Sequence, residues 1–457
     1  MVRGWMALGA VAGLLGSVLG LAHGASAQAQ SASDRAALEQ RVDELEQELS
    51  LVKRKLEVSD ETQASKGPQP VITAGSDGFT LRSADSSYVL KIRGYTQFDT
   101  RFFTDAPANR APGQDTFFFR RIRPLIEGTL ANVVDFRIMP DFAGSTLVVQ
   151  DAWANVHYIP EAALEFGKFK GPVGLERLQS ATAMWFVERA LPTQLVPNRD
   201  LGIMLNGVIG EGLFSYQLGW MNGAVDNTQT VNGDVDTGDD KDLLARVFFQ
   251  PFQDSGIGPL QGLGVGFAAT YGHQEGVTGS YKTSGQQTFF AFRSNVVETG
   301  ARYRYAPQAY WYWGPFGLLT EYVYNSSQYR RPGFSDTRAN NSAWQVAVGW
   351  AITGENESYK GLIPSVNFDP FKGTWGAWEA IARISELKVD DSIFDANFAD
   401  PTVSAEAAKL WSLGINWYLN RNVKIAVNYD RTTFRSYANN QDRHAEGVLL
   451  GRFQLSF

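Results

Sequence analysis

Segments of about ten residues in which apolar and polar side chains alternate recur from residue 85 to the carboxyl end of this 457-residue chain. In the stretch from 88 to 103, for example, Leu90 and Ile92 fall on one face, and Lys91 and Arg93 fall on the other. This period of two predicts strands with one apolar and one polar face. We count about sixteen such segments, each of the length that crosses a bilayer at a tilt.

The connections between these segments alternate between short and long. Tight turns at 132–133 and 420–422 are interleaved with long polar loops, as a transmembrane barrel requires, and segment 354–372 is the exception, being long where a turn is expected. Tryptophan and tyrosine recur at segment ends, as at Trp311 and Trp417, like the girdle at a membrane interface. A soluble β-sandwich or propeller is the alternative, but it has no use for this girdle. The pattern therefore predicts an all-β, 16-stranded antiparallel transmembrane β-barrel.

The amino-terminal residues have the features of a secretory signal. Arg3 is followed by an apolar run over 5–21 and by the cleavage motif Ala25-Ser26-Ala27. We expect residues 1–27 to be a signal peptide that directs export; a retained membrane anchor is the alternative. No later stretch has 18 consecutive apolar residues, so spanning by a helix is excluded.

A second period appears before the strands. Apolar residues there are spaced alternately by three and four, which is typical of a coiled coil, at Leu38, Val42, Leu45, Leu49, Val52 and Leu56. We expect a coiled coil over 34–58, a linker over 59–84 and the barrel over 85–457. Because an isolated helix of this length is marginal in water, self-association is expected to bury its stripe. A lone amphipathic helix lying on the body of the same chain is the alternative.

Composition and motifs exclude several classes of function. The chain has no cysteine, which removes disulfides and thiolate sites, and its net charge of −7 gives no sign of a nucleic-acid partner. His157, His273 and His444 are scattered, and no metalloprotease, nucleophile-elbow or phosphate-cradling motif occurs. We expect no enzyme, no cofactor and no metal site. The acidic loop at 226–242 lacks a full calcium-binding pattern and is interpreted as solvated.

One irregular segment, 166–199, fits neither period. Segments of this length are uncommon in compact domains unless they are functional loops. Glu176 and Glu188 are its acidic residues, and its basic residues are Lys168, Lys170, Arg177, Arg189 and Arg199. This excess of positive charge makes the segment the leading candidate for a functional loop.

Residues 79–457 resemble the phosphate-selective porin O and P family of Gram-negative outer membranes. The motifs behind the resemblance are FFFRRIRP (117–124), GLER (174–177), the ER pair (188–189), NWYLNRNVKIAVNYD (416–430) and the terminal Phe457. The resemblance implies a trimer of 16-stranded barrels, each with its third extracellular loop folded into the lumen. Segment 166–199 would be that loop.

The resemblance also implies a set of anion-binding residues at the pore constriction: Arg101, Arg120, Arg121, Asp151, Arg177, Ser180 and Arg189. By strand alternation, Arg121 and Arg123 share the lumen face, and Arg120 belongs to the other face or to the outer rim. The sequence departs from the family in three places. Arg177 replaces a lysine, Ala181 replaces a second serine, and the loop 275–295 offers only Lys282 and Arg293 where the family has a ladder of arginines.

These observations predict an outer-membrane diffusion channel that prefers anions, phosphate or related oxyanions. A guanidinium suits an oxyanion because its planar fork donates two parallel hydrogen bonds. Conduction requires several weak binding sites, so a nearby carboxylate that weakens anion binding is useful. The expected partners are small anions, outer-membrane lipid and two further copies of the chain. The alternatives are a general or sugar-type diffusion porin, and an envelope spacer whose coiled coil contacts the cell wall.

Overall fold

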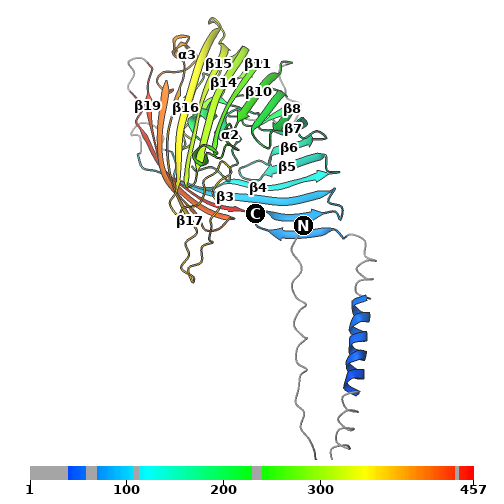
Figure 1. The fold of residues 1–457 in the computed structure, drawn as a ribbon. Coiled ribbons are helices and arrows are strands. Elements are labelled where there is room, and N and C mark those ends of the chain that lie inside the picture. Colours follow the sequence, from blue (N-terminus) through cyan, green and yellow to red (C-terminus); the bar gives the residue numbers. More distant parts are fainter. Residues whose placement is uncertain (1–39, 58–68, 106–112, 229–238, 438–441) are drawn as a thin grey trace, which may run out of the picture. The chain divides into compact units, whose positions relative to one another are not determined.

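The computed structural model describes residues 40–57, 69–105, 113–228, 239–437 and 442–457 (Figure 1). The chain divides into two units, Met1–Gln69 and Pro70–Phe457, which are described separately. The expected signal peptide, together with the two ends of the expected coiled coil, lies outside the described residues.

The described part of the first unit is an α-helix over residues 40–57. Its apolar stripe lies open in the single chain: Val42 is 49% exposed and Leu45 is 59% exposed. No helix in the described residues is long and apolar enough to cross a membrane. The heptad pattern therefore gives the expected helix, and its pairing with another copy stays a prediction.

Sixteen strands of the second unit form a closed antiparallel barrel (Figure 1). Each strand pairs with its neighbour in the chain, and β20 pairs with β3 to close the ring, with Leu450 opposite Arg101 and Gln454 opposite Gln97. The strands are β3 (Val89–Phe103), β4 (Thr116–Leu130), β5 (Val134–Asp141), β6 (Val148–Val156), β7 (Ala163–Phe169), β8 (Asp200–Ile209), β9 (Phe214–Met221), β10 (Asp242–Phe249), β11 (Leu263–Val277), β14 (Val297–Trp313), β15 (Phe316–Arg330), β16 (Thr337–Ala351), β17 (Ala377–Lys388), β18 (Ala407–Tyr418), β19 (Val423–Arg435) and β20 (Glu446–Ser456). The predicted barrel is confirmed.

A hairpin precedes the barrel, inside the segment that we expected to be linker. It consists of β1 (Val71–Gly75) and β2 (Gly78–Arg82). β2 pairs with β3 between the positions of Val89 and Ile92, just beyond the point where β20 ends. The strand β3 is longer than β20, so its free edge needs another partner for its backbone groups. The hairpin supplies that partner. Each of its strands has only five residues, which is too short for alternation to be recognised in the sequence.

A β-bulge in β4 corrects the expected direction of Arg120. The register between β3 and β4 shifts so that Gln97 is opposite Arg121 and Phe98 is opposite Phe119, which leaves Arg120 without a partner on β3. A bulge breaks strict alternation because one extra residue is inserted in one strand. Arg120 thereby reaches Glu188, a residue of the segment that connects β7 and β8.

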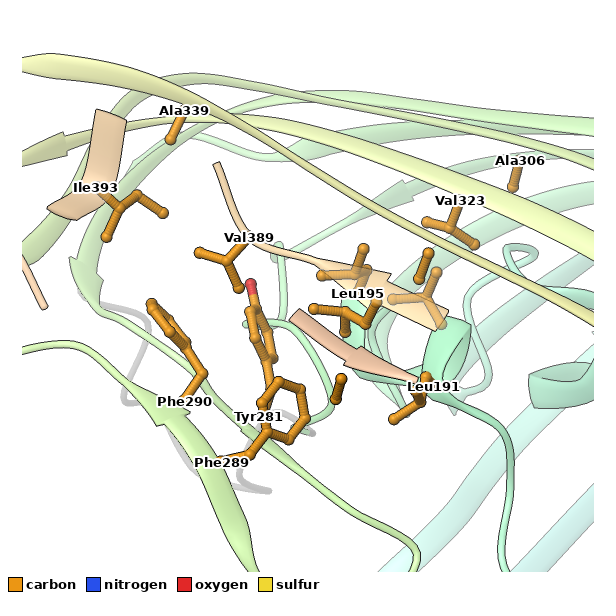
Figure 2. Packing of buried hydrophobic residues seen from close by; sticks show 14 of the residues in the cluster. Leu191, Leu195, Tyr281, Phe289, Phe290, Ala306, Val323, Ala339, Val389 and Ile393 are labelled. Carbon is orange, nitrogen blue, oxygen red and sulfur yellow. The ribbon is translucent and has the colours of Figure 1, made fainter. Parts of the chain in front are cut away.

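The loop between β11 and β14 differs from the expected polar loop. It contains a second hairpin, β12 (Ser280–Lys282) and β13 (Thr288–Ala291). The side chains of Tyr281, Phe289 and Phe290 are at most 2% exposed and belong to a buried apolar cluster, parts of which Figure 2 shows. The same cluster includes residues of the β7–β8 connection and of the strands β14–β18, as well as α3 (Asp391–Asp395). The aromatic residues of this loop therefore fill buried space, whereas the sequence predicted a polar loop.

The connection between β16 and β17 runs from residue 352 to residue 376 and lies at the end of the barrel that otherwise has short turns (Figure 1). Its tip is open, with Phe371 99% exposed. Its first part is buried: Glu355, Glu357 and Leu362 are 5–7% exposed. This connection, long where a turn is expected, therefore packs against the rest of the second unit through buried residues between 355 and 362.

Candidate functional site

The connection between β7 and β8, residues 170–199, is anchored to strands that are far apart in the wall. It contains α2 (Leu175–Leu178) and the 3-10 helix η1 (Leu191–Leu195). The backbone nitrogen of Leu175 donates to Glu321 of β15 over 2.6 Å, and that of Val187 donates to Asn428 of β19 over 3.1 Å. Both acceptors are buried, at 3% and 1% exposure. The segment therefore packs against the inward-facing side chains of several strands.

A cavity of about 640 Å³ lies between this segment and the strands β3 to β9. Six of the seven residues that the sequence singled out line it: Arg120, Arg121, Asp151, Arg177, Ser180 and Arg189. Arg101 does not line it, because the Arg101 guanidinium lies over the ring of Phe118, 4.9 Å from its centre. The Ser180 hydroxyl is 2.9 Å from that of Thr182.

Four further cations line the same cavity and are not among the seven residues that the resemblance implies. Arg123 and Arg137 come from β4 and β5, and strand alternation placed Arg123 on the lumen face with Arg121. Lys170 and Arg199 stand at the two ends of the β7–β8 connection, where alternation no longer applies. The sequence feature that pointed to these two residues was the excess of positive charge in segment 166–199.

Half of the eight cations are neutralised by carboxylates. Arg120 donates two hydrogen bonds to Glu188, at 2.6 and 3.2 Å. The other ion pairs are Arg123 with Asp141 at 2.7 Å, Arg199 with Asp151 at 2.7 Å, and Arg137 with Glu127 at 2.9 Å and with Asp151 at 3.9 Å. Asp151 therefore takes part in the site by holding two cations, one from β5 and one from the β7–β8 connection.

The other four cations, Lys170, Arg121, Arg177 and Arg189, have no carboxylate within ion-pair distance among the described residues. Their hydrogen bonds go to neutral groups. Arg121 donates to the Gln97 side chain, and Arg177 donates to Asn227 and to a backbone carbonyl. Arg189 and Lys170 both donate to the carbonyl of Gln179. The cavity therefore has uncompensated positive charge from four side chains.

Several groups of the connection have shifted pKa values, Lys170 and Glu188 among them. Burial, reinforced by the charges of Arg189 and Arg199, lowers the pKa of Lys170 well below its ordinary value. Burial alone would raise the pKa of Glu188, but the charge and hydrogen bonds of Arg120 outweigh it and lower that pKa to about 2. Glu188 is thus ionised at any physiological pH, whereas Lys170 loses its proton more easily than an exposed lysine.

Neither cation of the loop 275–295, Lys282 or Arg293, lines the cavity. Arg293 pairs with Asp400 at 3.4 Å, and the backbone nitrogen of Lys282 donates to Gln194 in η1. The departure from the family's extracellular arginine ladder, noted in the sequence, is therefore matched by a loop that packs on η1.

Comparison with solved structures gives the fold. The outer membrane channel DcaP of Acinetobacter baumannii superposes with a TM-score of 0.55 at 13% identity, covering 84% of this chain and all of that one. An anion-selective porin from Comamonas acidovorans gives 0.50 at 11% identity, covering 81% of this chain and all of that one. Both have sequences too distant to say more than that the architectures agree.

Comparison of sequences gives the family. Porin O of Pseudomonas aeruginosa is 24% identical over 433 residues, which cover 85% of this chain and 94% of that protein. The family model described as phosphate-selective porin O and P matches residues 90–457. A closed barrel of sixteen strands, a cation-lined cavity and this match over most of the chain agree: the protein is an outer-membrane channel, not an enzyme, and it belongs to the phosphate-selective porin O and P family.

Proposed function

We propose that this channel prefers anions, phosphate or related oxyanions among them, and that the β7–β8 connection forms its constriction. The observation behind the proposal is the cavity in which Lys170, Arg121, Arg177 and Arg189 have no carboxylate partner in the described part of the chain. Uncompensated charge in a narrow site with low-dielectric walls raises the local concentration of the opposite ion. The phosphate-selective porin family of this chain and the anion selectivity of the Comamonas porin are consistent with this preference.

The ion pairs in the same cavity favour passage over tight binding. A unit charge about 4 Å from an oxyanion interacts by about 4 kcal/mol at an effective dielectric of about 20, before desolvation is subtracted. Eight such contacts would hold the ion too long for conduction. Asp141, Asp151 and Glu188 reduce the number of free cations, and they leave a site that an anion can enter and leave.

The second part of the proposal concerns assembly. The strands β5 and β7 have only 8 and 7 residues, whereas β14 has 17. At about 3.3 Å per residue, seven residues extend roughly 23 Å before any tilt, which is less than the apolar band of a membrane barrel, about 25 Å tall. This low part of the wall is suited to contact with neighbouring copies in a homotrimer, and the helix over 40–57 is suited to hold those copies together as a coiled coil.

The test is planar-bilayer recording of the purified protein in potassium chloride, with inorganic phosphate titrated from one side. A reversal potential of anionic sign and block of the chloride current by phosphate are the expected results. A cationic or absent preference without block would instead support the general diffusion porin, which the net charge of −7 favours.

A further inference from the structure

The indole of Trp185 lies in a gap that two glycines leave in the barrel wall. Trp185 belongs to the β7–β8 connection and is 6% exposed. Gly317 of β15 and Gly349 of β16 are cross-strand partners. A Cβ added at Gly317 would lie 2.6 Å from the indole, and one at Gly349 would lie 2.7 Å from it. Neither glycine has a positive φ, so what these positions require is space, not backbone freedom.

Three parts of the molecule meet at this indole. Its Nε1 donates to Glu357 of the β16–β17 connection over 3.4 Å, and its ring packs edge-on against Tyr312 of β14 with centroids 6.1 Å apart. The backbone carbonyl of Trp185 accepts from Asn416 of β18 over 2.9 Å. The indole thus connects the β7–β8 connection to the wall and to the connection at the opposite end of the barrel.

The cavity lies a short distance along the chain. Glu188 and Arg189, which line it, follow Trp185 by three and four residues. The residues between them are also held: Phe186 lies under the Arg383 guanidinium at 4.1 Å, and Val187 donates to Asn428. A shift of the indole would therefore be passed to Glu188 and Arg189 through a short stretch of backbone.

We propose that Trp185 is a positioning residue for the constriction, held by the Gly317–Gly349 gap and by Glu357. The inference rests on the proposed function, because it assigns to Trp185 the placement of the charges that select anions. Trp185 does not itself line the cavity, and it acts through Glu188 and Arg189. A site that must be held to within a fraction of an ångström is normally supported by packed residues behind it.

The experiment compares four full-length variants with the wild type in planar bilayers. In Trp185→Ala the indole is lost, and in Gly317→Ala the new methyl group would meet its six-membered ring. Both should lower the anion-to-cation permeability ratio by at least about twofold, because Glu188 and Arg189 are displaced. Trp185→Ala should also raise single-channel conductance, because the volume of the indole is lost. Gly219→Ala in β9 is the matched control, since its Cβ would lie an ordinary 3.6 Å from Leu244.

The double variant Trp185→Phe with Gly317→Ala tests the gap itself. A phenyl ring is shorter than an indole and leaves room for the methyl group, so this pair should recover at least half of the ratio that Gly317→Ala loses. Heat-modifiable mobility on gels identifies folded barrels, and Trp185→Phe alone replaces Trp185→Ala if the latter does not fold. That single variant should keep an intermediate ratio.

The outcomes separate the two proposals. If the wild type shows no anion preference, the proposed function fails, and the conductance of the variants still decides the role of Trp185. If the wild type prefers anions while Trp185→Ala and Gly317→Ala keep its ratio and conductance, the positioning role is overturned and the proposed function stands. Recovery in the double variant, without any effect of Gly219→Ala, would support the gap as the cause.

Discussion

The carboxylate of Glu188 accepts two hydrogen bonds from the guanidinium of Arg120, and this pair joins the β7–β8 connection to β4 across the cavity. Both residues line the cavity, so each cancels a charge that would otherwise face it. Glu188 also remains ionised down to a pH of about 2. The pair therefore lowers the positive charge of the cavity at any physiological pH.

Replacing Glu188 by glutamine should increase anion preference. The amide keeps the shape of the side chain but no longer neutralises Arg120, which adds one uncompensated charge. We expect the anion-to-cation permeability ratio to rise at least about twofold and phosphate to block at lower concentration. Reversal potentials in a salt gradient measure the ratio. An unchanged ratio in correctly folded protein would show that Arg120 does not face the ion path.

Replacing Arg177 and Arg189 together by alanine should have the opposite effect. These two side chains provide half of the uncompensated charge in the cavity, and both belong to the β7–β8 connection. The permeability ratio should fall several-fold, to an extent that high salt reduces by screening. Arg330→Ala, at an exposed ion pair outside the cavity, is the control. If the double variant and the control behave alike, the connection is not the filter.

Replacing Asp151 by asparagine should tighten phosphate binding and lower phosphate conductance. Asp151 pairs with Arg199 at 2.7 Å and lies 3.9 Å from Arg137, so its loss frees the Arg199 guanidinium toward the cavity and leaves Arg137 with Glu127 alone. An ion held more tightly leaves more slowly. Titration of phosphate against chloride current measures the binding, and conductance in phosphate alone measures the passage. Weaker block in the variant would contradict the arrangement.

The anion preference should fall as the pH is raised, starting below the pH at which an ordinary lysine titrates. The pKa of Lys170 is lowered by burial and by Arg189 and Arg199, so its deprotonation removes one cation from the cavity. The preference is therefore fully present at low pH and declines through the lowered pKa. Reversal potentials at a series of pH values follow the change. The Lys170→Met variant should start lower and stay flat over the same range.

The helix over 40–57 should associate in parallel with the same helix of other copies. In such a pairing Arg41 of one helix faces Glu46 of the next, and Glu48 faces Lys53, so both flanking pairs are attractive. Because the chain has no cysteine, Leu49→Cys introduces a single thiol on the apolar stripe. Mild oxidation of membranes should produce cross-linked chains. Ser50→Cys, on the polar side, is the control, and equal cross-linking of both would count against the coiled coil.

The wall of the barrel could be predicted from the sequence because strand alternation reports directly on a surface that is apolar outside and polar inside. Alternation in the sequence runs over residues 200–210, and β8 (Asp200–Ile209) has almost the same limits. It also runs over residues 296–306, whereas β14 continues to Trp313. Its last residues, from Tyr310 on, are aromatic on both faces, so the contrast on which alternation depends is lost.

The site was less accessible to prediction, for three physical reasons. Alternation misplaced Arg120 because a bulge inserts it between two paired residues. It gave the face of Arg101 but not its height along the barrel, and Arg101 lies over Phe118, away from the cavity. The uncompensated charge of Lys170 depends on which carboxylates are close in space. The residues next to it in the sequence do not show which residues lie opposite it across the barrel.

The buried cluster of Figure 2, with Tyr281, Phe289 and Phe290 beside Leu191 and Leu195, occupies part of the enclosed space with hydrocarbon. The cavity is therefore displaced toward one arc of the wall, from β3 to β9. The size limit of such a channel is decided by its connections and not by its number of strands. Relatives with the same sixteen-stranded barrel can therefore diverge in the solutes that they pass. They do so by exchanging loop residues, while every strand of the wall keeps its register.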